Sequence, residues 1–171
     1  MTDLKKTISE MVESGDYSPR ICGVLNLILN DKMNSIEINN YLSQQCITIN
    51  EIKMETLQVV IDYANKSLED DILTEQEMNN IRLLKLFLKI KDGDFYLYGK
   101  KQDVKDVLSW QLRKMYKDDY IDKDEALMKN DLQSLFDLSY DQFLDIVNEI
   151  AQESINRGAD ISNLDTFILP K

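Results

Sequence analysis

Two stretches of the chain share one outline: residues 68–84 read LEDDILTEQEMNNIRLL, and residues 116–132 read YKDDYIDKDEALMKNDL. In each stretch a pair of aspartates precedes a residue that can cap a helix, Thr74 or Asp122, and a glutamate follows three positions later. This is the spacing of a capping box, in which each side chain accepts a hydrogen bond from the backbone N–H of the other residue. Both stretches therefore predict an acidic loop followed by a capped helix.

The match extends beyond these loops when the sequence is shifted by 48 positions against itself. Identical pairs include Asp70 and Asp118, Asp71 and Asp119, Glu77 and Glu125, Leu84 and Leu132, and Phe95 and Phe143. Apolar character also recurs at further paired positions, between residues 59–90 in the first copy and 107–138 in the second. Because the matches fall on caps, loop acids and the apolar face, we predict a duplicated hairpin made of helix, acidic loop and capped helix.

The rest of the chain also favours helices, since apolar residues recur at helical spacing and strand signals are scarce. Ser18 before Pro19 indicates a helix start, and Gly158 indicates a helix end. We expect an all-α protein, a compact bundle of roughly seven helices. Its predicted parts are an N-terminal helical extension (residues 1–50), the duplicated hairpin domain (51–158) and a tail that packs back on the domain (159–171).

The hairpins resemble a known family. A helix that ends in an acidic Asp-Asp loop, a capped helix with glutamate, and then LFDLSYDQFLDI (residues 135–146) look like the TerB family of tellurite-resistance and stress proteins. The resemblance covers about Glu51 to Gly158 and implies two pseudo-repeated hairpins. The sequence departs from the family pattern by having Asp-Asp where Asp-Gly is common, and by carrying GDFYLYG (residues 93–99) between the repeats.

The loop acids have two interpretations. An EF-hand is excluded, because neither Asp118 nor Asp122 as the first position places glycine at the sixth. A looser calcium or magnesium site remains possible if the two loops lie side by side, and the TerB resemblance implies the same idea. The candidate ligands are Asp70, Asp71, Asp118, Asp119, Asp122 and Asp124. The alternative is that the acids cap helices or lie in solvated loops, with no cofactor required.

An acidic stripe is expected on the long helix after Ser139. Its members recur every four residues: Asp137, Asp141, Asp145, Glu149 and Glu153. Like charges at this spacing cost a helix a few tenths of a kcal/mol per pair. The stripe is either a solvated face or a docking surface for a basic protein.

Residues 82–117 hold 10 of the 20 basic residues and only 4 acids. We expect the basic helix near Trp110 to pair with the acidic stripe, within one chain or between two chains of a homodimer, and we do not expect nucleic-acid binding. The aromatic residues of the GDFYLYG segment, Phe95, Tyr96 and Tyr98, either pack against the hairpins or form an exposed contact site.

Composition argues against several classes of function. The 171 residues include no histidine, so the commonest general base and zinc ligand is missing, and no phosphate-binding glycine motif occurs. No run of about 18 apolar residues and no signal peptide is visible, so we expect no membrane insertion and a cytoplasmic location. We do not expect an enzyme.

The expected function is therefore interaction with another protein. With a net charge of −11, the chain suits a non-catalytic module of a bacterial stress or defence system, including an immunity protein that neutralises a basic toxin. The alternative is a stress protein that binds calcium or magnesium through its loop acids.

Overall fold

A computed structural model describes residues 2–14, 16–69 and 72–164. Within these ranges the chain forms nine α-helices and no strand, which confirms the all-α prediction. The helices are α1 (Thr2–Glu13), α2 (Pro19–Leu29), α3 (Ser35–Gln44), α4 (Lys53–Ser67), α5 (Glu75–Phe87), α6 (Asp94–Leu97), α7 (Lys101–Met115), α8 (Lys123–Leu135) and α9 (Tyr140–Arg157). Short 3₁₀ turns occur at η1 (Ile49–Ile52), η2 (Tyr116–Asp118) and η3 (Ile161–Asn163).

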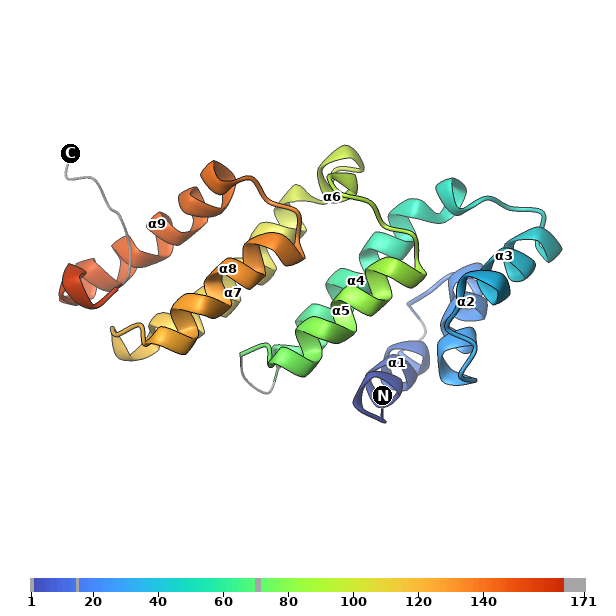
Figure 1. The fold of residues 1–171 in the computed structure, drawn as a ribbon, viewed down its shortest axis with the longest axis horizontal. Helices are drawn as coiled ribbons and strands as arrows, with labels where there is room; N and C mark the ends of the chain where they lie inside the picture. Colours follow the sequence, from blue (N-terminus) through green and yellow to red (C-terminus); the bar gives the residue numbers. More distant parts are fainter. Residues whose placement is uncertain (1, 15, 70–71, 165–171) are drawn as a thin grey trace.

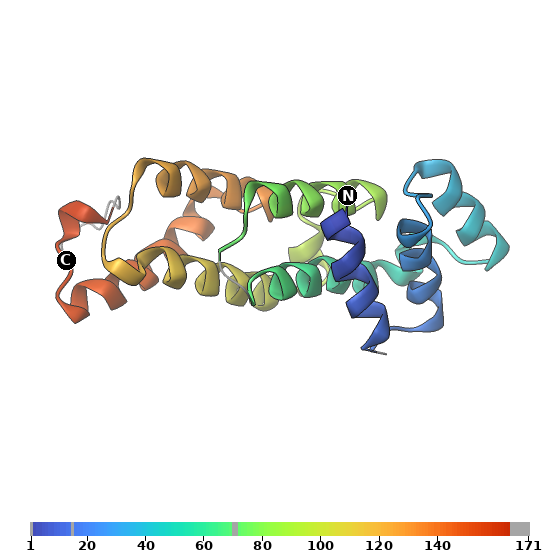
Figure 2. The same ribbon diagram turned by 90° about the horizontal axis from the view of Figure 1, so that it is seen from below.

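The helices lie in a row and give the molecule an elongated shape instead of the expected compact bundle (Figure 1). Seen along the perpendicular direction, α4 and α7 lie in one layer and α5 and α8 in the other, while α9 runs obliquely from the second layer towards the first (Figure 2). Neighbours within a layer are in contact, as are α4 with α5 and α1 with α4. Each hairpin thus contributes one helix to each layer.

The two hairpins have matching helix bounds. Helices α4 and α7 each contain 15 residues, and α5 and α8 each contain 13. Every helix of the second hairpin begins and ends 48 residues after its counterpart in the first. That the hairpins arose by duplication stays a prediction, but the offset found in the sequence coincides with the helix bounds.

Local hydrogen bonds explain why the helices start where they do. Both predicted capping boxes form: Glu77 accepts from the backbone N–H of Thr74 at 2.8 Å, and Glu125 accepts from that of Asp122 at 3.0 Å. Ser18 caps α2, which has Pro19 at its first position. Because a capping side chain satisfies backbone donors that the helix leaves unpaired, these starts are encoded locally.

The segment between the hairpins contains one helix that the sequence did not predict. Gly93 has a positive φ of 82°, which glycine adopts without strain, and α6 follows it. The Asp94 carboxylate accepts from the backbone N–H of Lys91 at 2.9 Å and pairs with the buried Lys53 ammonium at 3.0 Å. The short helix is therefore fixed against the start of α4.

The chain after α9 turns back onto the loop between α7 and α8. Asn163 accepts from the backbone N–H of Ile121 at 2.8 Å, and Leu164, which is buried, accepts from the Tyr116 hydroxyl at 3.1 Å. Up to Leu164 the chain thus packs on the second hairpin, and residues 165–171 of the predicted tail lie outside the described ranges.

Candidate functional site

The loop between α7 and α8 holds its acids through internal hydrogen bonds. Asp118 accepts from the backbone N–H of Tyr120 at 3.2 Å. Asp119 has a positive φ of 59° and pairs with the Arg157 guanidinium of α9 at 3.0 Å. This pair joins the loop to the end of α9.

The acids that begin α8 are used by the cap. The Asp122 carboxylate accepts from the backbone N–H groups of Asp124 and Glu125, both at 2.8 Å. The pKa of Glu125 is raised, first by burial and then by the negative charges of Asp122 and Asp118. The Asp124 side chain is exposed.

Of the six candidate metal ligands, the structure describes four: Asp118, Asp119, Asp122 and Asp124. Among the described parts of the chain, no group of three acidic or cysteine side chains is arranged to hold a metal ion. Asp70 and Asp71 lie outside the described residues, so a site shared between the two loops stays a prediction.

The acidic stripe on α9 faces the basic helix α7 in part. Glu149 pairs with the Lys105 ammonium at 2.7 Å, and Glu153 accepts from two nitrogens of Arg113 at 3.0 and 2.8 Å. The hydrogen bonds from Arg113 lower the pKa of Glu153 and in turn raise the pKa of Arg113. The expected pairing of the basic helix with the stripe is confirmed within one chain.

Asp137 does not belong to an exposed stripe. Its carboxylate is mostly buried after the end of α8, with both oxygens 2.8 Å from the Lys85 ammonium of α5. Burial raises the pKa of Asp137, while Lys85 acts in the opposite direction. Of the predicted stripe, Asp141 and Asp145 are the exposed members for which no ion pair occurs within the described ranges.

The aromatic segment is mainly structural. Phe95 is fully buried, with its ring centroid 5.8 Å from that of Phe136, so for this residue the packed alternative is correct and the exposed contact is wrong. Tyr96 and Tyr98 are half-buried against the core. Tyr96 and Asp145 line a small hollow of about 140 Å³.

A larger hollow lies between α8 and α9, and the described residues that line it are not among the predicted site residues. It is a groove of about 540 Å³, lined by both apolar and polar side chains. Leu127 of α8 and Tyr140 of α9 line it, although 66% and 60% of their surfaces are exposed. Exposing large apolar groups together in a concavity is unfavourable in water, so the groove is a candidate binding site.

The sequence contained one signal for this groove. In the 48-residue register Leu127 aligns with Asn79 of the first hairpin, so an apolar residue stands where the first copy has a polar one. The residues three and four positions from Leu127, such as Lys123, Asn130 and Asp131, are polar, so helical spacing places Leu127 away from the core face formed by Leu132 and Leu135. Which faces are covered depends on the neighbouring helices, which spacing does not determine.

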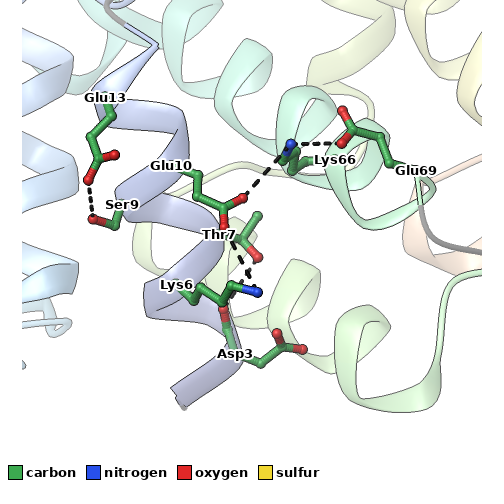
Figure 3. A network of polar contacts seen from close by, with 8 residues as sticks. All are labelled: Asp3, Lys6, Thr7, Ser9, Glu10, Glu13, Lys66 and Glu69. Atoms are coloured by element: carbon green, nitrogen blue, oxygen red, sulfur yellow. Dashed lines mark hydrogen bonds and ion pairs between the residues drawn. The ribbon is translucent and has the colours of Figure 1, made fainter.

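A second, polar hollow lies at the other end of the row. Between α1, the turn after it and α4, a space of about 330 Å³ is lined by Glu10, Asp16, Tyr17, Asp62 and Glu69 among others. Figure 3 shows that two of these acids pair with Lys66, Glu10 at 3.8 Å and Glu69 at 2.7 Å. Tyr17 donates to Asp62 at 2.6 Å, and burial, followed by that hydrogen bond, raises its pKa. These contacts join α1 and its turn to α4.

No protein-family model, curated protein or solved structure matches the chain. Among the described residues, no helix is both long and apolar enough to cross a membrane.

Proposed function

We propose that this chain is a non-catalytic protein-interaction module of a bacterial stress or defence system. The observation that carries the proposal is the groove between α8 and α9, because it leaves Leu127 and Tyr140 exposed beside the buried Phe143. Large apolar and aromatic side chains at a concave surface are the usual anchors of protein interfaces.

The acidic stripe supports the proposal less than the sequence suggested. Asp137, Glu149 and Glu153 are each neutralised by a basic side chain of the same chain, which leaves Asp141 and Asp145 to face solvent. The net charge of −11 still favours the approach of a basic protein by long-range attraction. An immunity protein that neutralises a basic toxin is the version of this function that suits such a charge.

The test is capture of a partner by the tagged chain from cells of its source, followed by reconstitution of the complex from purified proteins. The proposal predicts a partner that binds the wild-type chain with a one-to-one stoichiometry. Two variants locate the surface: Leu127→Asn in the groove and the pair Asp141→Lys with Asp145→Lys on α9. If no purified candidate binds the wild-type chain, the proposal is wrong.

A further inference from the structure

Helix α8 contacts two earlier helices of the row, α5 and α7. It lies beside α5 in one layer and opposite α7 in the other (Figures 1 and 2). Arg82 of α5 lies 3.7 Å from Asp131 of α8, and Gln111 of α7 donates to the Met128 sulfur at 3.5 Å. The seat of α8 is thus formed by α5 on one side and α7 on the other.

The groove occupies the equivalent position in the next repeat: it lies against α8 and α9, as α8 lies against α5 and α7. Its walls are α8, the counterpart of α5, and α9, which lies beside α7 as α7 lies beside α4. In the 48-residue register Asn130 and Gln133, which line the groove, take the positions of Arg82 and Lys85. Arg82 and Lys85 are the residues of α5 that pair with Asp131 and with Asp137 after the end of α8. The groove therefore continues an interface that the chain already uses.

The side chains of the groove indicate what kind of helix fits it. Leu127, Leu144 and Val147 supply apolar surface from both walls, and the charged residues among those that line it are Lys123 and Lys129. None of the described residues that line the groove is acidic, although the whole chain has 31 acids and 20 bases. Lys123 is exposed, whereas Lys129 is buried and donates to the Tyr116 hydroxyl at 3.2 Å.

We infer that the groove seats one amphipathic helix of a partner protein, in the position relative to α8 that α8 itself takes relative to α5. The apolar face of that helix packs on Leu127 and Leu144, and a carboxylate at its edge pairs with Lys123, as Asp131 pairs with Arg82. From Lys123 to Gln133 the wall is about 15 Å long, which matches roughly three turns of the bound helix. This inference rests on the proposed function and names the partner surface. The net charge affects the approach of the two proteins, whereas Lys123 acts locally in the bound complex.

Selection from a peptide library tests the inference even before a natural partner is identified. The library displays helix-constrained peptides of about 15 residues that carry leucine on one face, and it randomises the flanking positions among aspartate, lysine and serine. The bait is the full-length chain. We expect enrichment of peptides with aspartate at the flank, at least tenfold weaker binding to Leu127→Asn, and a preference for lysine at the flank when the bait carries Lys123→Glu.

Leu86→Asn is the matched control, because Leu86 is an exposed leucine on α5, outside the groove. Binding to this variant should equal binding to the wild-type chain, and thermal melts check that both variants fold. Three results would overturn the inference: a selection that enriches no peptide, peptides that bind Leu127→Asn as tightly as the wild-type chain, or enrichment of lysine-flanked peptides on the wild-type chain.

Two further results separate this inference from the proposed function. If a purified natural partner binds Leu127→Asn normally but loses affinity for the Asp141→Lys and Asp145→Lys variant, the chain is an interaction module that uses a different surface. If light scattering shows a wild-type dimer that Leu127→Asn converts to a monomer, a second copy of the chain covers the groove. Either result refutes the partner helix.

Discussion

The two hairpins have the same helix lengths but different neighbours in the row. Helix α4 lies between α1 and α7, and α5 contacts α4 and α8. In the second hairpin α7 is covered by α9, whereas α8 borders a groove. The comparison shows that one backbone design can serve either as core or as an exposed surface.

The side chains differ where the surroundings differ. At the edge of the first hairpin Arg82 and Lys85 pair with acids of the second. At the same positions the second hairpin has the uncharged Asn130 and Gln133, and Leu127 replaces Asn79. An internal contact thus uses ion pairs, while the open edge presents an apolar surface of the kind found at the centre of protein interfaces.

The largest expected effect comes from the residue that links the hairpins. Phe95→Ala removes a fully buried ring that contacts Phe136, and we expect a loss of about 3–5 kcal/mol in the free energy of unfolding. The control is Tyr140→Ala at the open groove, which should cost no more than about 0.5 kcal/mol. Urea denaturation measures both values, and equal losses would contradict the distinction between enclosed and open regions.

Breaking the ion pair between the hairpins is expected to have the next largest effect. Lys85→Met leaves the mostly buried Asp137 carboxylate without its cation, which should cost about 3 kcal/mol at pH 7. Because the pKa of Asp137 is already raised by burial, the cost should shrink as the pH falls and this carboxylate takes up a proton.

The control for this pair is Arg82→Met, since Arg82 and Asp131 are exposed and their separation is 3.7 Å. We expect a change within about 0.5 kcal/mol for this variant. Adding Asp137→Asn to Lys85→Met should restore part of the lost stability by removing the buried charge. If Lys85→Met and Arg82→Met were equally stable, the ion pair between Lys85 and Asp137 would not be the contact that fixes the second hairpin.

A smaller effect is expected from the cap of α8. Since burial raises the pKa of Glu125, the folded chain holds a proton on the Glu125 carboxyl group more tightly than the unfolded chain does. This contribution to stability is present below the pKa that Glu125 has in the unfolded chain. It is lost as the pH rises through the higher pKa that Glu125 has in the folded chain. Relative to Glu125→Gln, the wild-type chain should therefore become less stable between pH 4 and pH 7. Melting curves at several pH values measure the difference, and the opposite trend would contradict the assignment.

The smallest expected effect is that of metal ions. Asp119 is paired with Arg157, and Asp122 accepts the backbone hydrogen bonds of its cap, so the loop between α7 and α8 already uses these acids. We expect millimolar calcium or magnesium to leave the melting temperature unchanged, because a bound ion would raise it. A rise that EDTA reverses would instead favour the cation-binding alternative.

The sequence predicted the helix starts because their determinants are local. Thr74 with Glu77, Asp122 with Glu125, and Ser139 with Gln142 all form capping boxes, and each pair is only three residues apart. The 48-residue offset likewise follows from features within each hairpin. Helix α6 was not predicted, because its four residues are too few to show a helical period.

The groove and the fate of the acidic stripe could not be predicted, because both depend on contacts distant in sequence. Asp137, whose own φ is 57°, pairs with Lys85, which is 52 residues away in the sequence. Glu149 and Glu153 meet side chains of α7 that are 44 and 40 residues away. Leu127 is exposed, and that it lines a groove together with Tyr140 depends on how α9 packs beside α8.

The most direct test follows the backbone amide signals of the full-length chain by NMR while an acid-flanked helical peptide from the selection is added. If the groove seats a helix, the largest shift changes fall on the walls, at Leu127, Asn130, Leu144 and Val147, and the amides around Leu86 on α5 do not move. Changes centred on α5 or on the hollow beside α1, with the groove signals unmoved, would contradict the claim that the open edge of the second hairpin is a docking face.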